Sequence, residues 1–363
     1  MLGRIPISNT FAGRRSHSSL LVMNASHTTV LVTGGSGYVG TWTVAGLLER
    51  GYRVRTTIRS FDREVIVRAA VRRHTPADDR LSFVVADLLR DEGWDRAVDG
   101  VSFVLHVASP MPIREYRKTD IVRAAREGTI RILKAAAAAN VSRVVMMSSA
   151  QAALPFEEDD AALTDESLWT NLTRKDATDY MRSKTLAERD AWDFIRDAGG
   201  RMDLTTVLPV TILGPVLQST VSGSPEVLQR LLKGALPAIP RIGFSIVDVR
   251  DLVDLQVRAM LAPEASGERF IATSDFFWLR EIAALLRSEL GPAGAKVPSR
   301  ALPDLVVRAF AFIDFEARFV APSLGKKQLF SSMKARRILG SRFRAAHDTI
   351  VDGARSLIVM GAV

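Results

Sequence analysis

A glycine-rich turn close to the N-terminus constrains the fold of this chain more than any other feature. The apolar run at residues 30–32 predicts a short buried strand, and TGGSGYVG at residues 33–40 leads from it into a helix. In that context Gly34, Gly37 and Gly40 allow a tight turn, close approach of the backbone to a pyrophosphate, and close packing of helix on strand. The helix N-terminus adds free N–H groups and a positive dipole. We therefore predict a dinucleotide site here, with an ordinary glycine-rich turn as the alternative.

Strand and helix patterns alternate up to Pro209, which is typical of a parallel sheet wound by helices. Further strands are expected at residues 53–58, 81–85, 103–107, 144–147 and 204–208, and long helices at 121–139 and 178–197. Later in the chain, residues 246–249 and 269–272 are expected to return to the sheet. The predicted fold is α/β, a Rossmann-type doubly wound parallel sheet with a smaller, mostly helical C-terminal lobe. We assign residues 28–209 and 244–274 to the dinucleotide-binding domain, and 210–243 and 275–363 to a substrate lobe.

The composition narrows the function classes. None of the 363 residues is cysteine, which excludes disulfides and thiolate metal sites and fits a cytoplasmic location. We expect no bound metal. No apolar run reaches the length of about 18 residues that a membrane span needs. The most apolar late stretch, residues 301–315, contains a proline and three charged side chains, so we expect a packed helix there.

The net charge of +9 is unevenly distributed. Residues 1–60 carry seven arginines against one acid, and residues 317–347 carry eight Lys or Arg against none, which leaves the rest of the chain at −5. Basic ends around an acidic body fit solvated surface and some phosphate binding better than a groove for nucleic acid, and we expect no nucleic-acid partner. Residues 1–27 contain no acid. We expect a disordered or non-native extension there, and a mitochondrial-type presequence is the alternative.

The end of the second expected strand indicates which dinucleotide is bound. An NAD site usually places an acid here for the ribose 2′-hydroxyl, whereas an arginine accommodates a 2′-phosphate. There is no acid between Gly51 and Phe61, and Arg59 stands where the acid would be. This favours NADPH, and a solvated strand-end arginine is the alternative.

Tyr180 and Lys184 lie four residues apart on the expected helix 178–197, so both side chains leave the same face. A nearby cation favours phenolate over phenol and can lower a tyrosine pKa from about 10. A tyrosine tuned in this way can pass a proton to or from an alcohol oxygen. The spacing alone is weak evidence, because such pairs also occur by chance on exposed helices.

Taken together, these motifs resemble the extended short-chain dehydrogenases/reductases, and within them the dihydroflavonol 4-reductase group and bacterial aldehyde and ketone reductases. The resemblance rests on the turn at 33–40, VRTTIR at 54–59, ADL at 86–88, HVASP at 106–110, EGT at 127–129, MSSA at 147–150, YMRSKTLAER at 180–189, LPV at 208–210, LGP at 213–215 and VDVRD at 247–251. These residues extend over most of the chain and are specific for the superfamily, but they say little about one substrate.

The resemblance implies roles position by position. Ser149, Tyr180 and Lys184 would be catalytic, with Tyr180 as the acid/base and Ser149 holding the substrate oxygen. An NADP(H) site would be lined by Gly34, Gly37, Tyr38, Val39, Gly40, Arg59, Asp87, Leu88, Val107, Ala108, Ser109, Tyr180, Lys184 and Pro209. The substrate would contact Met111, Ser149 and Tyr180. Structural alternatives stay open, since Ser149 and Asp87 could simply cap turns or helices and Pro209 could only end its strand.

The resulting hypothesis is an NADPH-dependent carbonyl reductase acting on a small molecule, present as a monomer or a homodimer. A nucleotide-sugar epimerase or dehydratase that uses NAD, and a 3β-hydroxysteroid-type dehydrogenase, are the alternatives on the same fold. Ala125 stands where many extended members have asparagine, which counts against the epimerase. A cofactor-sensing regulator typically lacks the Tyr/Lys pair. The apolar pocket residues Met111, Leu154, Phe156, Trp169 and Leu172 favour a moderately apolar carbonyl compound.

Overall fold

The computed structural model describes residues 25–76, 78–110, 120–155, 163–174, 176–199, 202–313 and 315–363. The extension expected at residues 1–27 lies outside these ranges except for Ala25–His27, which form a turn of 3-10 helix. Among the described residues, no helix is both long and apolar enough to cross a membrane.

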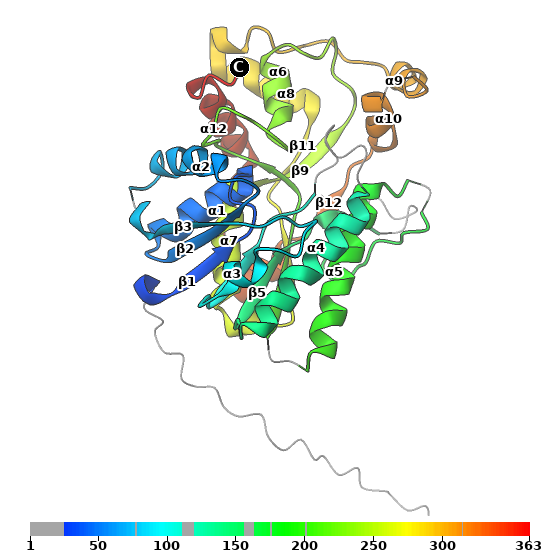
Figure 1. Cartoon of the computed structure of the whole chain (residues 1–363). Helices are drawn as coiled ribbons and strands as arrows, with labels where there is room; N and C mark the ends of the chain where they lie inside the picture. The colour runs from blue at the N-terminus through cyan, green and yellow to red at the C-terminus, as the bar shows by residue number, and fades with distance from the viewer. Residues whose placement is uncertain are drawn as a thin grey trace, which may run out of the picture.

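A seven-stranded sheet forms the centre of the molecule, in the order β10-β7-β5-β4-β1-β2-β3 (Figure 1). Its strands are β1 (Thr29–Val32), β2 (Arg53–Ile58), β3 (Leu81–Val85), β4 (Phe103–His106), β5 (Arg143–Met147), β7 (Asp203–Pro209) and β10 (Arg269–Ala272). Every neighbouring pair is parallel. Most strands are nearly continuous apolar runs because both faces of the sheet are covered by helices. The predicted doubly wound α/β fold is confirmed.

Two apolar cores lie on the two faces of this sheet. One contains side chains of α1 (Tyr38–Glu49), α2 (Asp62–Arg72), α7 (Val249–Leu261) and α11 (Met333–Leu339). The other contains side chains of α3 (Trp94–Val98), α4 (Ile121–Ala138) and α5 (Asp179–Asp197). The two long helices that the pattern predicts therefore pack side by side on one face, and α2 and α3 are additional helices that the pattern does not predict.

The C-terminal lobe has its own core, formed by α6 (Glu226–Leu232), α8 (Leu279–Leu290), α12 (Ala346–Val359) and a three-stranded sheet. That sheet has the order β11-β9-β8, with bounds Phe276–Trp278, Gly243–Asp248 and Thr211–Leu213. The expectation that residues 246–249 return to the main sheet is wrong, because β9 pairs with β8 and β11 instead. The expected return at 269–272 is confirmed, since β10 pairs with β7. The division into two domains stays a prediction.

Smaller elements complete the chain. They are the paired strands β6 (Leu163–Thr164) and β12 (Leu329–Phe330), the helices α9 (Asp304–Phe310) and α10 (Phe315–Val320), and 3-10 helices at Asp78–Arg80, Ala150–Ala152, Pro263–Ala265, Gly291–Gly294 and Ala321–Ser323.

The α9–α10 segment does not pack as the sequence predicts. Within α9 only Val307 is buried, whereas Leu305 in the helix and Phe312 and Ile313 just after it are 79%, 84% and 82% exposed. Both ends of this segment contact the same residue, Arg241. The Arg241 guanidinium donates to Asp304 at 2.6 Å, and the Arg241 carbonyl accepts from the Gly325 N–H at 2.7 Å.

Candidate cofactor and active site

The candidate site lies along the carboxyl edge of the main sheet, where parallel strands place the residues that follow them. The glycine turn follows β1, Arg59 follows β2, Asp87 follows β3 and Ser149 follows β5. A hollow of about 250 Å³ at this edge is lined by Leu88, His106, Ala108, Ser109, Pro110, Ala125, Thr129, Met146, Met147, Lys184 and Ala187. It brings four of the predicted residues together, namely Leu88, Ala108, Ser109 and Lys184.

The glycine turn has the backbone shape that a dinucleotide requires. Gly34 has φ +73°, a conformation that side chains rarely adopt, and a Cβ there would lie 3.0 Å from Ala108 Cβ. A Cβ at Gly40 would lie 2.1 Å from the Gly34 carbonyl oxygen, so Gly40 lets α1 pack onto the turn. Gly37 is different, because it is exposed and its Cβ would meet nothing closer than 3.5 Å.

The same turn leaves the start of α1 open to an anion. Gly37 is the N-cap and cannot accept from the first-turn N–H groups with a side chain. The first-turn N–H groups and the positive end of the helix dipole therefore lie at the exposed Gly37, which is the usual arrangement for binding phosphate. The chemistry of this donor set fits the diphosphate of a dinucleotide.

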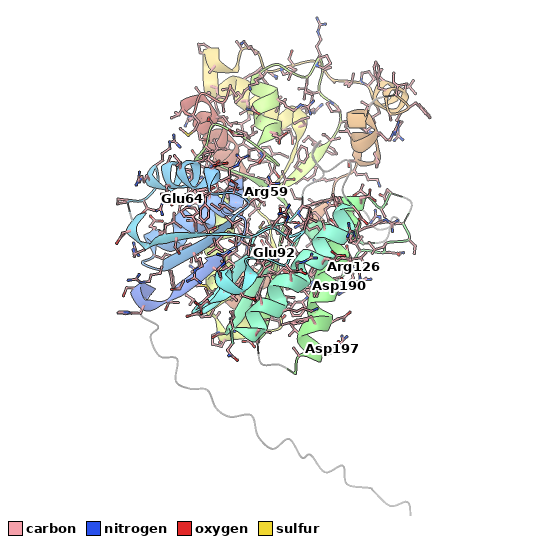
Figure 2. The ribbon with its side chains drawn as sticks, in the orientation of Figure 1. Arg59, Glu64, Glu92, Arg126, Asp190 and Asp197 are labelled. Atoms are coloured by element: carbon pink, nitrogen blue, oxygen red, sulfur yellow. The ribbon has the colours of Figure 1, made fainter. Side chains whose placement is uncertain are left out.

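The remaining predicted cofactor residues lie along the same edge. Arg59 is exposed at the end of β2, where Figure 2 shows it beside the start of α2. The Asp87 carboxylate accepts from the Leu89 N–H at 2.9 Å, so it also caps a local turn. Val107 is buried directly after β4, and Pro209 ends β7 and is buried. Met111 lies outside the described residues.

Ser149, Tyr180 and Lys184 come together where β5 ends beside α5. Lys184 is only 4% exposed, and its Nζ donates to the Met147 carbonyl at 3.3 Å and lies 6.0 Å from the centre of the Tyr180 ring. The Ser149 Oγ accepts from the Gln151 N–H at 3.2 Å, and Ser149 also hydrogen-bonds Tyr180. The helix spacing of Tyr180 and Lys184 and the position of Ser149 after β5 thus place a serine, a phenol and an ammonium close together, and their catalytic roles stay a prediction.

The protonation states differ from the expectation. Burial raises the pKa of Tyr180, and the hydrogen bond to Ser149 opposes that rise only in part. The expected lowering of the Tyr180 pKa by Lys184 is therefore wrong for this structure. Burial lowers the pKa of Lys184 to about 8, and Glu188 opposes that change. At neutral pH this leaves Tyr180 as a protonated phenol, the form that can donate a proton.

His106 holds the turn together rather than carrying protons. Its Nδ1 shares a hydrogen bond of 2.9 Å with the Thr33 hydroxyl, whose oxygen also accepts from the Ala108 N–H at 3.0 Å. Burial and then the charge of Lys184 lower the pKa of His106 to about 3, so the ring is neutral. We assign His106 no part in proton transfer.

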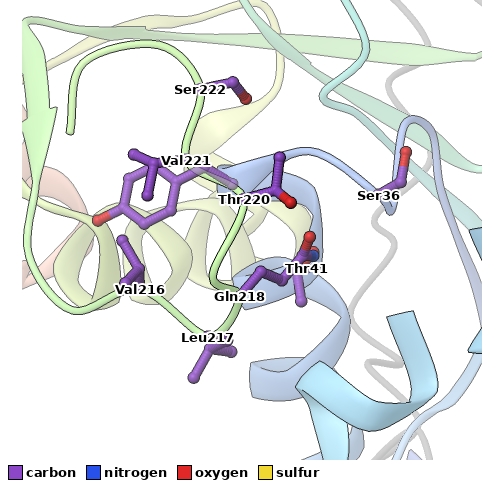
Figure 3. Close-up of a pocket in the computed structure, with 9 residues that line it drawn as sticks. Ser36, Thr41, Val216, Leu217, Gln218, Thr220, Val221 and Ser222 are labelled. Atoms are coloured by element: carbon purple, nitrogen blue, oxygen red, sulfur yellow. The ribbon is translucent and has the colours of Figure 1, made fainter. Parts of the chain in front are cut away.

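Sequence reasoning missed a second group of residues at the same end of α1. Residues 216–222 approach the helix and form with it a hollow of about 330 Å³, lined by Ser36, Tyr38, Thr41, Val216, Leu217, Gln218, Thr220, Val221 and Ser222 (Figure 3). The Gln218 amide donates to the Thr41 hydroxyl at 2.8 Å, and the Trp42 indole N–H donates to the Pro215 carbonyl at 2.7 Å. The only sequence signal was the cluster of hydroxyl side chains after Gly214-Pro215.

Comparison with known proteins agrees with this geometry. The sequence profile of the NAD dependent epimerase/dehydratase family matches residues 30–272. Cinnamoyl-CoA reductase 1 of Arabidopsis thaliana is 35% identical over 249 residues, which cover 68% of this chain and 70% of that protein. Dihydroflavonol 4-reductase of Zea mays is 31% identical, over 71% and 73% of the two chains.

Solved structures show the same fold. Yeast methylglyoxal/isovaleraldehyde reductase Gre2 complexed with NADPH has a TM-score of 0.75 at 24% identity, covering 93% of this chain and all of that one. UDP-glucose-4-epimerase from Stenotrophomonas maltophila with bound NAD has a TM-score of 0.73 at 19% identity. The match covers 92% of this chain and 99% of the epimerase. At such identities the likeness establishes the fold alone.

Fold, glycine turn and sequence relatives define an oxidoreductase that uses a nicotinamide dinucleotide. The chain belongs to the NAD dependent epimerase/dehydratase family, the extended short-chain dehydrogenases/reductases. The predicted resemblance is thereby confirmed.

Proposed function

We propose that the chain is an NADPH-dependent carbonyl reductase that converts an aldehyde or ketone into an alcohol. The observation that carries the proposal is the arrangement of the Tyr180 phenol, hydrogen-bonded to Ser149 and beside Lys184, at the sheet edge that also holds the glycine turn. Names of the relatives support a reductase, and Arg59 at the end of β2 supports a 2′-phosphate.

The residues would divide the work as follows. When bound, NADPH supplies the hydride that the carbonyl carbon receives. The Ser149 and Tyr180 hydroxyls hold the carbonyl oxygen, so charge is stabilised where it develops. Tyr180 then donates its proton to that oxygen, and its raised pKa keeps the proton available up to alkaline pH. Lys184 places a positive charge beside the phenol and would bind the nicotinamide ribose.

A panel of aldehydes, α-diketones and aryl ketones tests the proposal with the purified protein. We expect oxidation of NADPH to be faster than oxidation of NADH, and Tyr180→Phe to lower kcat by about 100- to 10,000-fold while NADPH still binds. Spectrophotometric rates and a fluorescence titration with NADPH measure the two effects.

The panel, a separate assay with sterols and the cofactor content of the purified protein together separate the alternatives. No turnover with either cofactor would sink the reductase assignment. NAD retained through purification would favour an epimerase or dehydratase, and turnover confined to sterols a 3β-hydroxysteroid-type dehydrogenase. The physiological substrate, the cytoplasmic location and the choice between monomer and homodimer stay predictions.

A further inference from the structure

Below the Tyr180–Lys184 pair, α5 carries a third polar side chain on the same face. Glu188 follows Lys184 by one helical turn and is fully buried, with 0% of its side chain exposed. The sequence motif around the Tyr/Lys pair contains Glu188, but neither the predicted site nor the proposed chemistry uses it. A buried carboxylate requires partners, because an isolated charge away from water is strongly unfavourable.

Glu188 has partners on three strands. Its carboxylate accepts from the Ser148 hydroxyl at the end of β5 (2.6 Å), from the Thr206 hydroxyl in β7 (2.7 Å) and from the Arg269 Nε in β10 (2.8 Å). The Arg269 guanidinium also lies 3.8 Å over the Trp169 ring and donates to the carbonyls of Glu166 and Leu168. The carboxylate is therefore fixed in position between the helix and three strands of the sheet.

Glu188 is linked to the proposed catalytic residues in two ways, by one of these contacts and by its position on α5. Ser148 directly precedes Ser149, so the Ser148–Glu188 hydrogen bond fixes the backbone from which Ser149 projects. Lys184 and Glu188 occupy positions i and i+4, which are neighbours on a helix. We propose that Glu188 is a positioning residue of the active site, which holds the Ser148–Ser149 strand end and carries the negative charge that faces Lys184.

The other groups around Lys184 do not provide such a charge. From α4 the hollow is lined by Ala125 and Thr129, and from β5 by Met146 and Met147, all uncharged. His106 from β4 is neutral, and Tyr180 is a phenol with a raised pKa. Arg269 lies behind Glu188 and pairs with it. Among the described residues, Glu188 is the acid that favours the charged form of Lys184.

The test measures Lys184 directly and without a substrate. The chain has nine lysines, so the Cε signals of ¹³C-labelled lysine can be followed by NMR through a pH titration of the free protein. In Glu188→Gln the midpoint of Lys184 should fall by about one pH unit. The matched control is Asp190→Asn on the outer face of the same helix, where Asp190 pairs with Arg126 at 2.5 Å (Figure 2) and the midpoint should not move.

A second variant covers the case in which Glu188→Gln does not fold. Glu188→Gln with Arg269→Met removes both buried charges and leaves no unpaired guanidinium, and the Lys184 midpoint should again fall. An unchanged midpoint in either folded variant overturns the proposal.

The role in catalysis rests on the proposed reductase function and has its own readout. In the pH profile of kcat, the alkaline limb of Glu188→Gln should move to lower pH, in step with the Lys184 midpoint. Ser148→Ala should lower kcat at every pH without moving the limb. A wild-type protein that turns over no carbonyl compound contradicts the proposed function, whereas the NMR result still decides the effect of Glu188 on Lys184. A uniform loss of kcat in Glu188→Gln, with limb and midpoint unmoved, shows a merely structural role.

Discussion

At the scale of single residues, Gly37 and Gly40 separate what the fold needs from what the cofactor needs. A Cβ at Gly40 would collide with the Gly34 carbonyl at 2.1 Å, so the protein itself requires that glycine. A Cβ at Gly37 would make only an ordinary contact of 3.5 Å with the Gly34 carbonyl oxygen, and φ there is −79°, which any residue can adopt. Packing within the protein therefore does not require a glycine at 37, and we propose that the approach of the cofactor does.

Gly37→Ala should weaken NADPH binding by about tenfold or more, while the free energy of unfolding changes by less than about 1 kcal/mol. Isothermal titration and urea unfolding measure the two quantities. The matched Gly40→Ala should lose more than about 2 kcal/mol of stability, because backbone must move. Unaltered NADPH affinity in Gly37→Ala would mean that the phosphates bind elsewhere.

Residue spacing predicted which groups meet at the site but not their protonation. Positions i and i+4 on α5 are a local rule, so the pairing of Tyr180 and Lys184 followed from the spacing, whereas the place of Ser149 beside them was implied only by the family resemblance. The pKa of Tyr180 depends on burial by segments distant in the sequence, and the charge of Lys184 does not outweigh it. Glu188 was missed for the same reason, since its partners Ser148, Thr206 and Arg269 lie in strands or directly after one elsewhere in the chain.

At the scale of elements, we propose that the carboxyl end of β2 determines the choice of cofactor and that its amino end does not. Arg59 follows the carboxyl end, at the edge where the glycine turn lies, and Arg53 begins the strand at the opposite edge. Arg59→Asp should lower kcat/KM for NADPH by about 10- to 100-fold and reverse the preference towards NADH, because a carboxylate repels the 2′-phosphate and accepts from a 2′-hydroxyl.

The control for this change is Arg53→Asp, which should leave the ratio of kcat/KM for NADPH to kcat/KM for NADH unaltered. Arg53 is exposed, and among the contacts described its Nε donates only to the Ser26 carbonyl, at 3.1 Å. Parallel rates with NADPH and NADH supply the comparison. An unchanged preference in Arg59→Asp would remove the argument for NADPH.

Elements of the main sheet followed from the sequence better than those of the lobe. Apolar residues are spaced differently along a buried strand and along the helix that follows it, so the alternation of strands and helices up to Pro209 could be predicted. A short apolar run such as β9 looks the same whichever sheet it joins, so its pairing with β8 and β11 was not predictable. Residues 301–315 were predicted to pack because they are apolar. Whether an apolar helix is buried depends on which other segments pack against it, and the sequence pattern does not show that.

At the scale of the whole molecule, one acid joins segments that are far apart in the sequence. Asp176 lies just before α5 and pairs with Arg174, whose guanidinium also donates to the Pro155 carbonyl at 2.7 Å. The Lys326 Nζ approaches the same carboxylate at 3.1 Å from the segment after α10. Hydrogen bonds from Arg174 and then Lys326 lower the pKa of Asp176 to about 2.

The sign of the resulting pH dependence follows from this lowered pKa. The charged carboxylate stabilises the fold above the ordinary aspartate pKa, and this contribution is lost as the pH falls towards 2. Asp176→Asn should lower the free energy of unfolding by about 1–2 kcal/mol at pH 7, after allowance for partial exposure, and by less as the pH approaches 3. Denaturant unfolding at both pH values checks it. Asp193→Asn, in an exposed pair with Arg196, should have almost no effect at either pH, and a loss for Asp176→Asn that grows in acid would contradict the assignment.

Both ends of the α9–α10 segment contact Arg241, so the chain should tolerate insertions within this segment. A segment closed at its base adds little to the entropy cost of folding when its length changes, because the ends remain joined by the same contacts. Residues 304–325 are thus a natural insertion point. A reporter domain or affinity tag placed at the exposed Phe312–Ile313 tip would leave the sheet edge and its hydroxyl, phenol and ammonium groups where they are.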